Sequence, residues 1–182
     1  MSSPPATPIR STSSIPPDDP KRNLVRTQAD DRNLPHIGLV GDTYTTLLTG
    51  KDTAGRYCLV DMLIPPGGGP PPHRHDFEES FIVLEGEIEA TFRGVKTAAS
   101  AGQTLHIPAN APHQFHNNSD RAARLLCICS PAGQEEFFAK VGVPVATRTA
   151  PPPKLDEKAE AEFIAKAKAL APEYKTELLR PA

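Results

Sequence analysis

Two histidines separated by a single residue, with a glutamate four residues after the second, constrain this chain more than any other feature of its sequence. They are His73, His75 and Glu79. In an extended strand, residues two apart point to the same side of a sheet, so the two imidazoles can converge on one point. Imidazole nitrogens and a carboxylate oxygen are suitable ligands for first-row divalent metal ions. The segment therefore predicts a metal site built on a β-sheet.

Strand alternation chooses between two adjacent glutamates. In the strand expected at residues 79–84, Glu79 and Phe81 point to one side, whereas Glu78 would point with Ile82 to the other. The apolar run that follows fits a strand inside a folded domain. Glu79 is therefore the predicted carboxylate ligand, and Glu78 is the competing candidate.

A second histidine-rich segment lies downstream, between Gly102 and Asn117. If residues 111–117 are extended, His113, Phe115 and Asn117 share one face, and His116 points the opposite way. Five of the six histidines of the chain fall between residues 73 and 116. His113 is therefore a candidate for the same site as the first two histidines.

The middle of the chain consists of short segments with strand character. Residues 43–49 and 57–64 are rich in β-branched and aromatic side chains, and residues 87–93 alternate cleanly between polar and apolar. Similar runs are found at residues 79–84, 103–107, 111–117 and 121–130, and glycines punctuate them. At least seven strands at this spacing predict an all-β sandwich or barrel.

The two ends of the chain differ from this middle part. Residues 1–36 are polar and proline-rich and are expected to be disordered or draped over the domain or a partner. Residues 37–130 are expected to form the barrel, and residues 131–182 a helical extension. A first helix is expected over residues 134–141, with Ser130 as its cap and Pro131 at its first position.

A proline linker at residues 151–153 is expected to lead to a second helix that Asp156 caps. Apolar residues follow at helical spacing and are predicted to pack against the barrel rather than bind a ligand. They are Phe163, Ile164, Ala167 and Leu170.

Composition excludes several classes of function. The 182 residues carry a net charge of −2 with no long basic run, so nucleic acid is not an expected partner. No apolar stretch approaches the roughly 18 residues of a transmembrane helix, and the N-terminal region does not resemble a secretory signal. Three cysteines are too few for a disulfide framework. A cytoplasmic protein that does not bind membranes is the expectation.

The two histidine segments together resemble the paired motifs of the cupin superfamily, over residues 37–130. The first motif is matched by His73, His75, Glu79 and Gly86, with Gly67 or Gly69 as its opening glycine at a shifted spacing. The second is matched by Gly102, Pro108, His113 and Asn117. Asn110 replaces its internal glycine, and asparagine tolerates a positive φ better than most residues.

The flanking sequence is similar to single-domain cupins related to bacterial quercetin 2,3-dioxygenases. This resemblance implies a cupin double-stranded β-helix, a jelly-roll barrel, with one metal ion per chain held by His73, His75, Glu79 and His113. It also implies that Glu79 accepts the substrate proton as a catalytic residue. Ligand types alone do not choose between manganese, iron, cobalt, nickel, copper and zinc. Cupins of this size commonly form homodimers, which is the expectation here.

A substrate pocket is expected beside the metal, although the same pattern describes the core of any barrel. Its candidate residues are Met62, Phe81, Val83, Phe92, His106 and Phe115, of which His106 could equally lie on the surface. Cys127 and Cys129 alternate within an apolar strand; a CxC pair can bind metal, but buried packing is the simpler interpretation, as it is for Cys58.

Three functions fit these expectations. The leading hypothesis is a dioxygenase whose small-molecule substrate chelates the metal through an enol or hydroxyl beside a carbonyl, as a flavonol does. The second is a non-oxidative isomerase, lyase or decarboxylase in which the metal is only a Lewis acid. The third is a binding module without catalysis.

Overall fold

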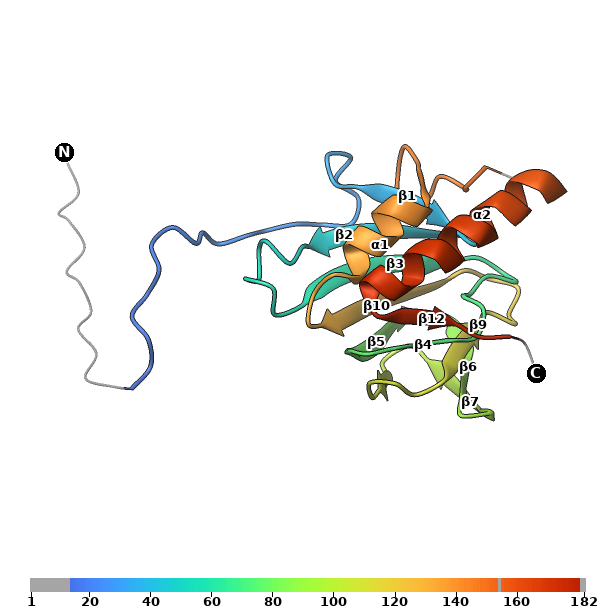
Figure 1. Ribbon diagram of the computed structural model, residues 1–182, viewed down its shortest axis with the longest axis horizontal. Coiled ribbons are helices and arrows are strands. Elements are labelled where there is room, and N and C mark those ends of the chain that lie inside the picture. The colour runs from blue at the N-terminus through green and yellow to red at the C-terminus, as the bar shows by residue number, and fades with distance from the viewer. Residues whose placement is uncertain (1–13, 154, 181–182) are drawn as a thin grey trace.

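The computed structural model describes residues 14–153 and 155–180, and the first part of the predicted N-terminal arm lies outside the described residues. Two antiparallel sheets face each other and enclose the core (Figure 1). Consecutive strands repeatedly change sheet, as in a jelly-roll barrel. The expected all-β fold with C-terminal helices is confirmed.

The larger sheet has seven strands in the order β11-β1-β2-β3-β10-β5-β8. All neighbours in it are antiparallel. Its strands are β1 (His36–Leu39), β2 (Asp42–Leu48), β3 (Cys58–Ile64), β5 (Glu78–Glu85), β8 (Thr104–Ile107), β10 (Ala123–Ser130) and β11 (Val143–Pro144).

The smaller sheet has five strands in the order β12-β4-β9-β6-β7, again antiparallel. They are β4 (His73–His75), β6 (Glu87–Phe92), β7 (Val95–Ser100), β9 (His113–His116) and β12 (Thr176–Leu178). Strands β4 and β5 are consecutive but belong to different sheets, so His75 and Glu79 approach the core from opposite walls.

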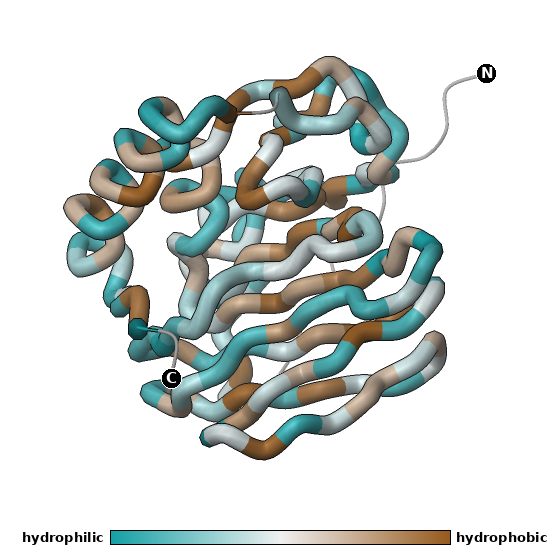
Figure 2. The backbone as a smooth tube through the Cα atoms, turned by 90° about the vertical axis from the view of Figure 1, so that its right-hand side faces the viewer, coloured by the Kyte–Doolittle hydropathy of each residue, from teal (hydrophilic) through white to brown (hydrophobic). Residues whose placement is uncertain are grey.

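Alternation along the strands builds the core between the two sheets. In β10 every second residue is buried, and these residues are Ala123, Leu125, Cys127 and Cys129. Strand β5 behaves in the same way, with Glu79, Phe81 and Val83 buried. Figure 2 shows the same alternation of apolar and polar residues across the strands. The inward face predicted for this part of the chain is therefore present.

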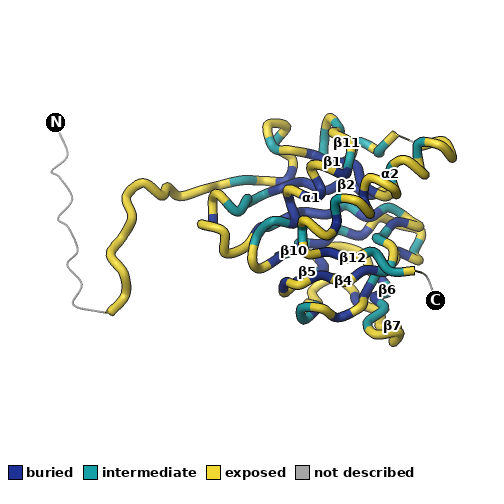
Figure 3. Tube along the Cα trace, viewed as in Figure 1, coloured by how far each residue is buried: buried dark blue, intermediate teal, exposed yellow. Residues whose placement is uncertain are grey.

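The N-terminal segment from residue 14 to residue 26 is an exposed arm that extends away from the sheets (Figures 1 and 3). The Arg22 guanidinium donates to the Asp52 carbonyl at 3.0 Å. Nearer the barrel, Asp30 pairs with Arg148 at 3.0 Å. The N-terminal segment thus makes polar contacts with the domain at Arg22 and Asp30, and Ala29 between them is buried.

Helix α1 (Gln134–Val141) follows β10, but it does not begin where the sequence predicted. Ser130 is still the last residue of β10, and its hydroxyl donates to the Arg56 carbonyl instead of capping a helix. Gly133 is the N-terminal flanking residue and provides no side-chain cap. The predicted cap at Ser130-Pro131 is wrong, because the strand continues to this serine.

Helix α2 (Glu157–Leu170) leads into a 3-10 turn, η1 (Ala171–Tyr174). As predicted, Asp156 caps α2 by accepting a hydrogen bond from the Ala159 backbone at 2.8 Å. The helix contacts α1 and η1 and is exposed along most of its length (Figure 3). Within the described residues, no helix is long and apolar enough to cross a membrane.

The apolar stripe of α2 faces the barrel and packs against it only in part. Ala167 is buried, Phe163 is half-buried, and Ile164 is 41% exposed. All three border a cavity that separates the helix from the barrel. The predicted packing therefore holds for Ala167, which belongs to the core, and for Phe163 and Leu170, which pack against that core, but not for Ile164.

Strand β12 returns the chain to the barrel and pairs with β4. Thr176 lies opposite His75, and Leu178 lies opposite His73. Arg74, between the two histidines, also pairs with Glu177 across the two strands. The C-terminal segment thus covers the edge of the strand that carries both histidines.

Candidate metal centre

Four side chains converge between the two sheets. His73 and His75 extend from β4, His113 from the adjacent strand β9, and Glu79 from β5 of the opposite sheet. His73 lies directly opposite His113 in the β4–β9 ladder. The four possible ligand atoms all lie within 4.8 Å of one another, and each side chain is at most 8% exposed. The structure brings together the set that the sequence named, and Glu78 is not part of it.

The three imidazoles are held in one orientation by backbone carbonyls. The Nδ1 atoms of His73, His75 and His113 lie 2.8, 2.9 and 2.9 Å from carbonyl oxygens of Pro71, Phe77 and Ala111. A carbonyl can only accept, so each Nδ1 carries the proton and donates. Nε2 is therefore the nitrogen left to ligate a metal ion, once it carries no proton. Ligating histidines in metalloproteins are commonly oriented in this way.

Glu79 closes the centre from the opposite side. Its Oε2 atom lies 3.0 Å from the Nε2 atoms of both His75 and His113. Burial alone would raise the pKa of this carboxyl, but the hydrogen bonds and charge of the two imidazoles outweigh burial and hold the pKa well below its usual range. Glu79 is therefore a carboxylate at neutral pH despite being 3% exposed.

The histidines respond differently to this environment. Burial, reinforced by the neighbouring His113, lowers the pKa of His73 to about 4. Burial also acts to lower the pKa of His113, but its contact with the Glu79 carboxylate reverses the effect and raises the pKa. His73 is thus neutral at neutral pH, whereas His113 holds a proton more tightly because Glu79 accepts a hydrogen bond from it.

The donor set fits a divalent metal ion. Three imidazole nitrogens with fixed tautomers and one ionised carboxylate converge in a buried space, and the Nδ1 protons already have acceptors. A cation placed there would separate the Glu79 carboxylate from the ring nitrogens that now contact it. The group can therefore hold a metal, whose identity these ligand types do not select.

The glycine- and proline-rich loop before His73 is pressed against β9. Gly69 has a φ of 131°, and a Cβ atom there would collide with the Phe115 carbonyl oxygen. Asn117 fixes the same region, because its side-chain amide donates to the Ile64 and Arg121 carbonyls at 2.9 and 2.8 Å. The loop therefore supports the approach of His73, and Asn117 is a structural residue, not a ligand.

Two thiols touch the second oxygen of Glu79, which sequence reasoning did not foresee. Cys127 and Cys129 are fully buried, with their Sγ atoms 3.2 and 3.6 Å from Glu79 Oε1. The Cys129 thiol acts to lower the pKa of Cys127, but burial and the Glu79 carboxylate outweigh it and raise that pKa to about 12. The Cys127 thiol is therefore protonated and donates to Glu79.

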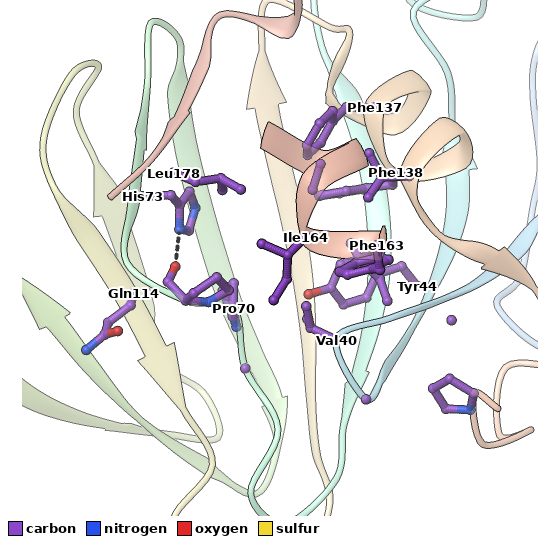
Figure 4. A pocket seen from close by; sticks show the side chains of 18 of the residues that line it. Val40, Tyr44, Pro70, His73, Gln114, Phe137, Phe138, Phe163, Ile164 and Leu178 are labelled. Carbon is purple, nitrogen blue, oxygen red and sulfur yellow. Dashed lines mark hydrogen bonds between the residues drawn. The ribbon is translucent and has the colours of Figure 1, made fainter. Parts of the chain in front are cut away.

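A cavity of about 1070 Å³ extends from this centre to the C-terminal helices. His73 lies at one end of it (Figure 4), and Glu79, which belongs to the same centre, also lines it. Three of the apolar residues predicted for a pocket line the cavity, namely Met62, Phe81 and Phe115. The remainder of its wall comes from residues that the sequence analysis did not assign to a pocket, among them Tyr44, Gln134, Phe137, Phe138, Phe163 and Ile164.

The other three predicted pocket residues lie outside this cavity lining, each for a local reason. Val83 is 1% exposed and belongs to the closely packed core. Phe92 is covered by the Arg93 guanidinium, 4.8 Å from the ring centroid. His106 lies on the outer face of the sheet, because it pairs with Ser80, which points away from Glu79; its ring contacts Ser80 and Glu78 at 3.0 and 3.1 Å.

Comparison with known proteins agrees with this architecture. Residues 60–129 match the family model described as "Cupin domain". The chain is 32% identical over 89 residues to an endoribonuclease YbeY of Myxococcus xanthus, and 28% identical over 128 residues to a quercetin 2,3-dioxygenase of Bacillus subtilis. These alignments cover 49% and 70% of this chain but only 29% and 37% of the relatives, so the chain spans about a third of their length.

Among solved structures, the polyketide cyclase RemF from Streptomyces resistomycificus superimposes with a TM-score of 0.52 and 21% identity. The superposition covers 84% of this chain and 96% of that one. At this identity the likeness concerns the fold.

Proposed function

We propose that this chain, which carries a cupin domain, is a metal-dependent dioxygenase acting on an enol or hydroxy-carbonyl compound of flavonol type. One observation carries the proposal: three oriented imidazoles and an ionised carboxylate lie at one end of a large apolar cavity. The similarity to the quercetin dioxygenase of Bacillus subtilis supports the same substrate class.

The residues of the chain have distinct roles in this proposal. His73, His75, His113 and Glu79 would hold the metal. When bound, the ion supplies a Lewis-acid centre at which adjacent substrate oxygens and dioxygen can meet. The backbone acceptors of the three Nδ1 atoms hold the imidazoles in place with Nε2 toward the centre.

Glu79 would also act as the proton acceptor. It borders the cavity and is ionised, so its carboxylate is available to a substrate hydroxyl that loses a proton. The aromatic and aliphatic wall, including Phe81 and Phe115, would exclude water and strengthen electrostatic interactions at the reacting group.

The test is metal analysis of the purified protein followed by oxygen uptake with quercetin. We expect about one ion per chain and uptake that depends on the metal. Glu79→Gln and His113→Ala should lose the activity, whereas His106→Ala should retain it, because His106 lies on the outer face. Metal-loaded protein that consumes no oxygen with quercetin and related enediols would contradict the dioxygenase assignment.

A non-oxidative reaction at the same centre is the second candidate, and the similarity to a dimethylsulfoniopropionate lyase of Ruegeria pomeroyi, 34% identical over 90 residues, supports it. Turnover of the substrate under strict anaerobiosis would favour the second candidate. Progressive oxidation of Cys127 during aerobic turnover, detected by mass spectrometry, would instead mark an oxygen-activating centre.

A further inference from the structure

The cavity is too large for a small single-ring substrate alone. Its volume of about 1070 Å³ lies just above the range of about 300–1,000 Å³ found for ligand pockets. Helix α2 forms its far wall without filling it, and Ile164 remains 41% exposed. In Figure 4 the Ile164 side chain lies between the side of the cavity that carries His73 and the side that carries Tyr44. The shape therefore suits a skeleton of several rings.

The chemistry of the wall selects a neutral, flat ligand. Away from the metal centre the cavity presents aromatic rings, including Tyr44, Phe137, Phe138 and Phe163. Tyr44 and Phe138 meet edge to face, with centroids 4.9 Å apart. Charged side chains of α2 that border the cavity, Glu160 and Lys168, are exposed at its rim. Aromatic walls of this kind favour stacked or edge-on contacts with aromatic ligands.

One polar group interrupts the apolar wall at the helical end. Gln134, the first residue of α1, borders the cavity and is 6% exposed. Its Oε1 atom is buried and accepts no hydrogen bond from any described residue. An unpaired buried acceptor is unfavourable, and a ligand that brings a donor would relieve that cost.

We propose that helix α2 and Gln134 form the substrate-selecting end of the cavity. This end accepts the part of a polycyclic aromatic ligand farthest from the metal, and the Gln134 amide accepts a hydrogen bond from a hydroxyl of that part. The inference rests on the proposed function in one respect: it takes the metal-chelating end of the ligand to lie at His73 and Glu79. Beyond the proposed function, the inference requires that the substrate have several rings and a hydroxyl on the part farthest from the metal.

Binding to the Zn²⁺-loaded protein tests this without turnover. The three ligands are quercetin, 3-hydroxyflavone, which lacks the additional hydroxyls, and catechol, which has one ring. Ile164→Trp narrows the cavity, and Val95→Trp is the matched control on an exposed strand, 66% exposed. Because the natural chain has no tryptophan, the introduced indole at residue 164 also reports binding by fluorescence.

We expect Ile164→Trp to weaken quercetin and 3-hydroxyflavone at least roughly tenfold and to leave catechol unchanged, with no effect of Val95→Trp. Gln134→Met, which keeps the length of the side chain but removes its polar atoms, should weaken quercetin roughly three- to tenfold and leave 3-hydroxyflavone unchanged. Equal weakening of both flavonols by Gln134→Met, or no selective effect of Ile164→Trp, would overturn the inference.

Failure of this inference can be told apart from failure of the dioxygenase proposal. If both flavonols bind with the expected dependence on Ile164 and Gln134 but no oxygen is consumed, the dioxygenase proposal fails and the selecting end stands. If oxygen is consumed with single-ring enediols while neither flavonol binds, the selecting end is refuted and the dioxygenase proposal survives in another substrate class.

Discussion

The two ends of the cavity are held together by different means. At the metal end, each side chain is buried, and its polar atoms are fixed by backbone carbonyls or by neighbouring side chains. At the helical end, α2 has one buried residue, Ala167, and Gln134 leaves an acceptor unpaired. One end is therefore rigid and polar, and the other is apolar and loosely filled.

This difference indicates which end of the cavity can accept substitutions. The metal end depends on strands of both sheets, so its ligands move only if the barrel moves. The helical end depends on two helices outside the sheets, and of their residues that border the cavity, those of α1 are buried while Ile164 of α2 is 41% exposed. Substitutions there should alter which ligand fits while leaving the metal centre intact.

The largest expected effect comes from removing a ligand at the metal end. His113→Ala should lower the affinity for Co²⁺ roughly 100-fold or more, because one of four ligands and its fixed tautomer are lost. Isothermal titration with Co²⁺ measures this, and His106→Ala, which removes an exposed imidazole, is the control. If His113→Ala bound Co²⁺ as tightly as the natural chain, the assignment of this end of the cavity as the metal end would be wrong.

A buried acid behind the cavity wall, Asp42, predicts a pH effect. Asp42 accepts a hydrogen bond from Tyr44, a residue of the cavity wall, and is completely buried. Burial raises its pKa to about 8, against hydrogen bonding from Tyr44 that acts to lower it. The unfolded chain loses this proton near pH 4 and the folded chain near pH 8, so the group destabilises the fold increasingly as pH rises between these values.

Asp42→Asn should abolish that dependence. We expect the variant to be more stable than the natural chain at pH 8 by about 2 kcal/mol, which is below the full value of the shift because an amide carries its own burial cost. The difference should shrink toward pH 4. Urea denaturation at both pH values checks this, and parallel pH profiles of the two proteins would contradict it.

A smaller effect is expected where the thiols meet the metal end. Cys127→Ala removes the donor to Glu79 Oε1 and should weaken Co²⁺ binding roughly three- to tenfold, with a change in the visible absorption of the bound ion. Cys58→Ala creates a similar void in the same core without a contact to Glu79, and should leave the spectrum unchanged. Identical spectra for both variants would show that the thiol does not orient Glu79.

The smallest effect tests the helical end directly. Ile164→Ala should change the free energy of unfolding by less than about 0.5 kcal/mol, because this side chain is 41% exposed and borders the cavity. Ile88→Ala, at 2% exposed in the core, should cost about 3 kcal/mol. Similar losses for the two variants would mean that α2 is packed as firmly as the barrel.

The same contrast explains what the sequence could predict. Strand alternation places His73 and His75 on one face of β4, and within β5 it turns Glu79 rather than Glu78 inward. Asn110, with a φ of 68°, adopts the turn conformation that its place in the motif requires. The contact between Cys129 and Glu79 depends on β10 lying beside β5, and no local pattern specifies that register. The cavity wall at Phe137 and Phe163 depends on the distance between the helices and the sheets. The helical periodicity of the sequence carries no information about that distance.

The pairing of β12 with β4 has a consequence for how the protein is made. The edge of the strand that carries His73 and His75 has no partner on that side until Thr176 and Leu178 are available, about a hundred residues later in the chain. During synthesis the nascent barrel therefore exposes an open strand edge beside the metal-binding residues. A partly synthesised chain that binds metal early would therefore do so before β12 has paired with β4.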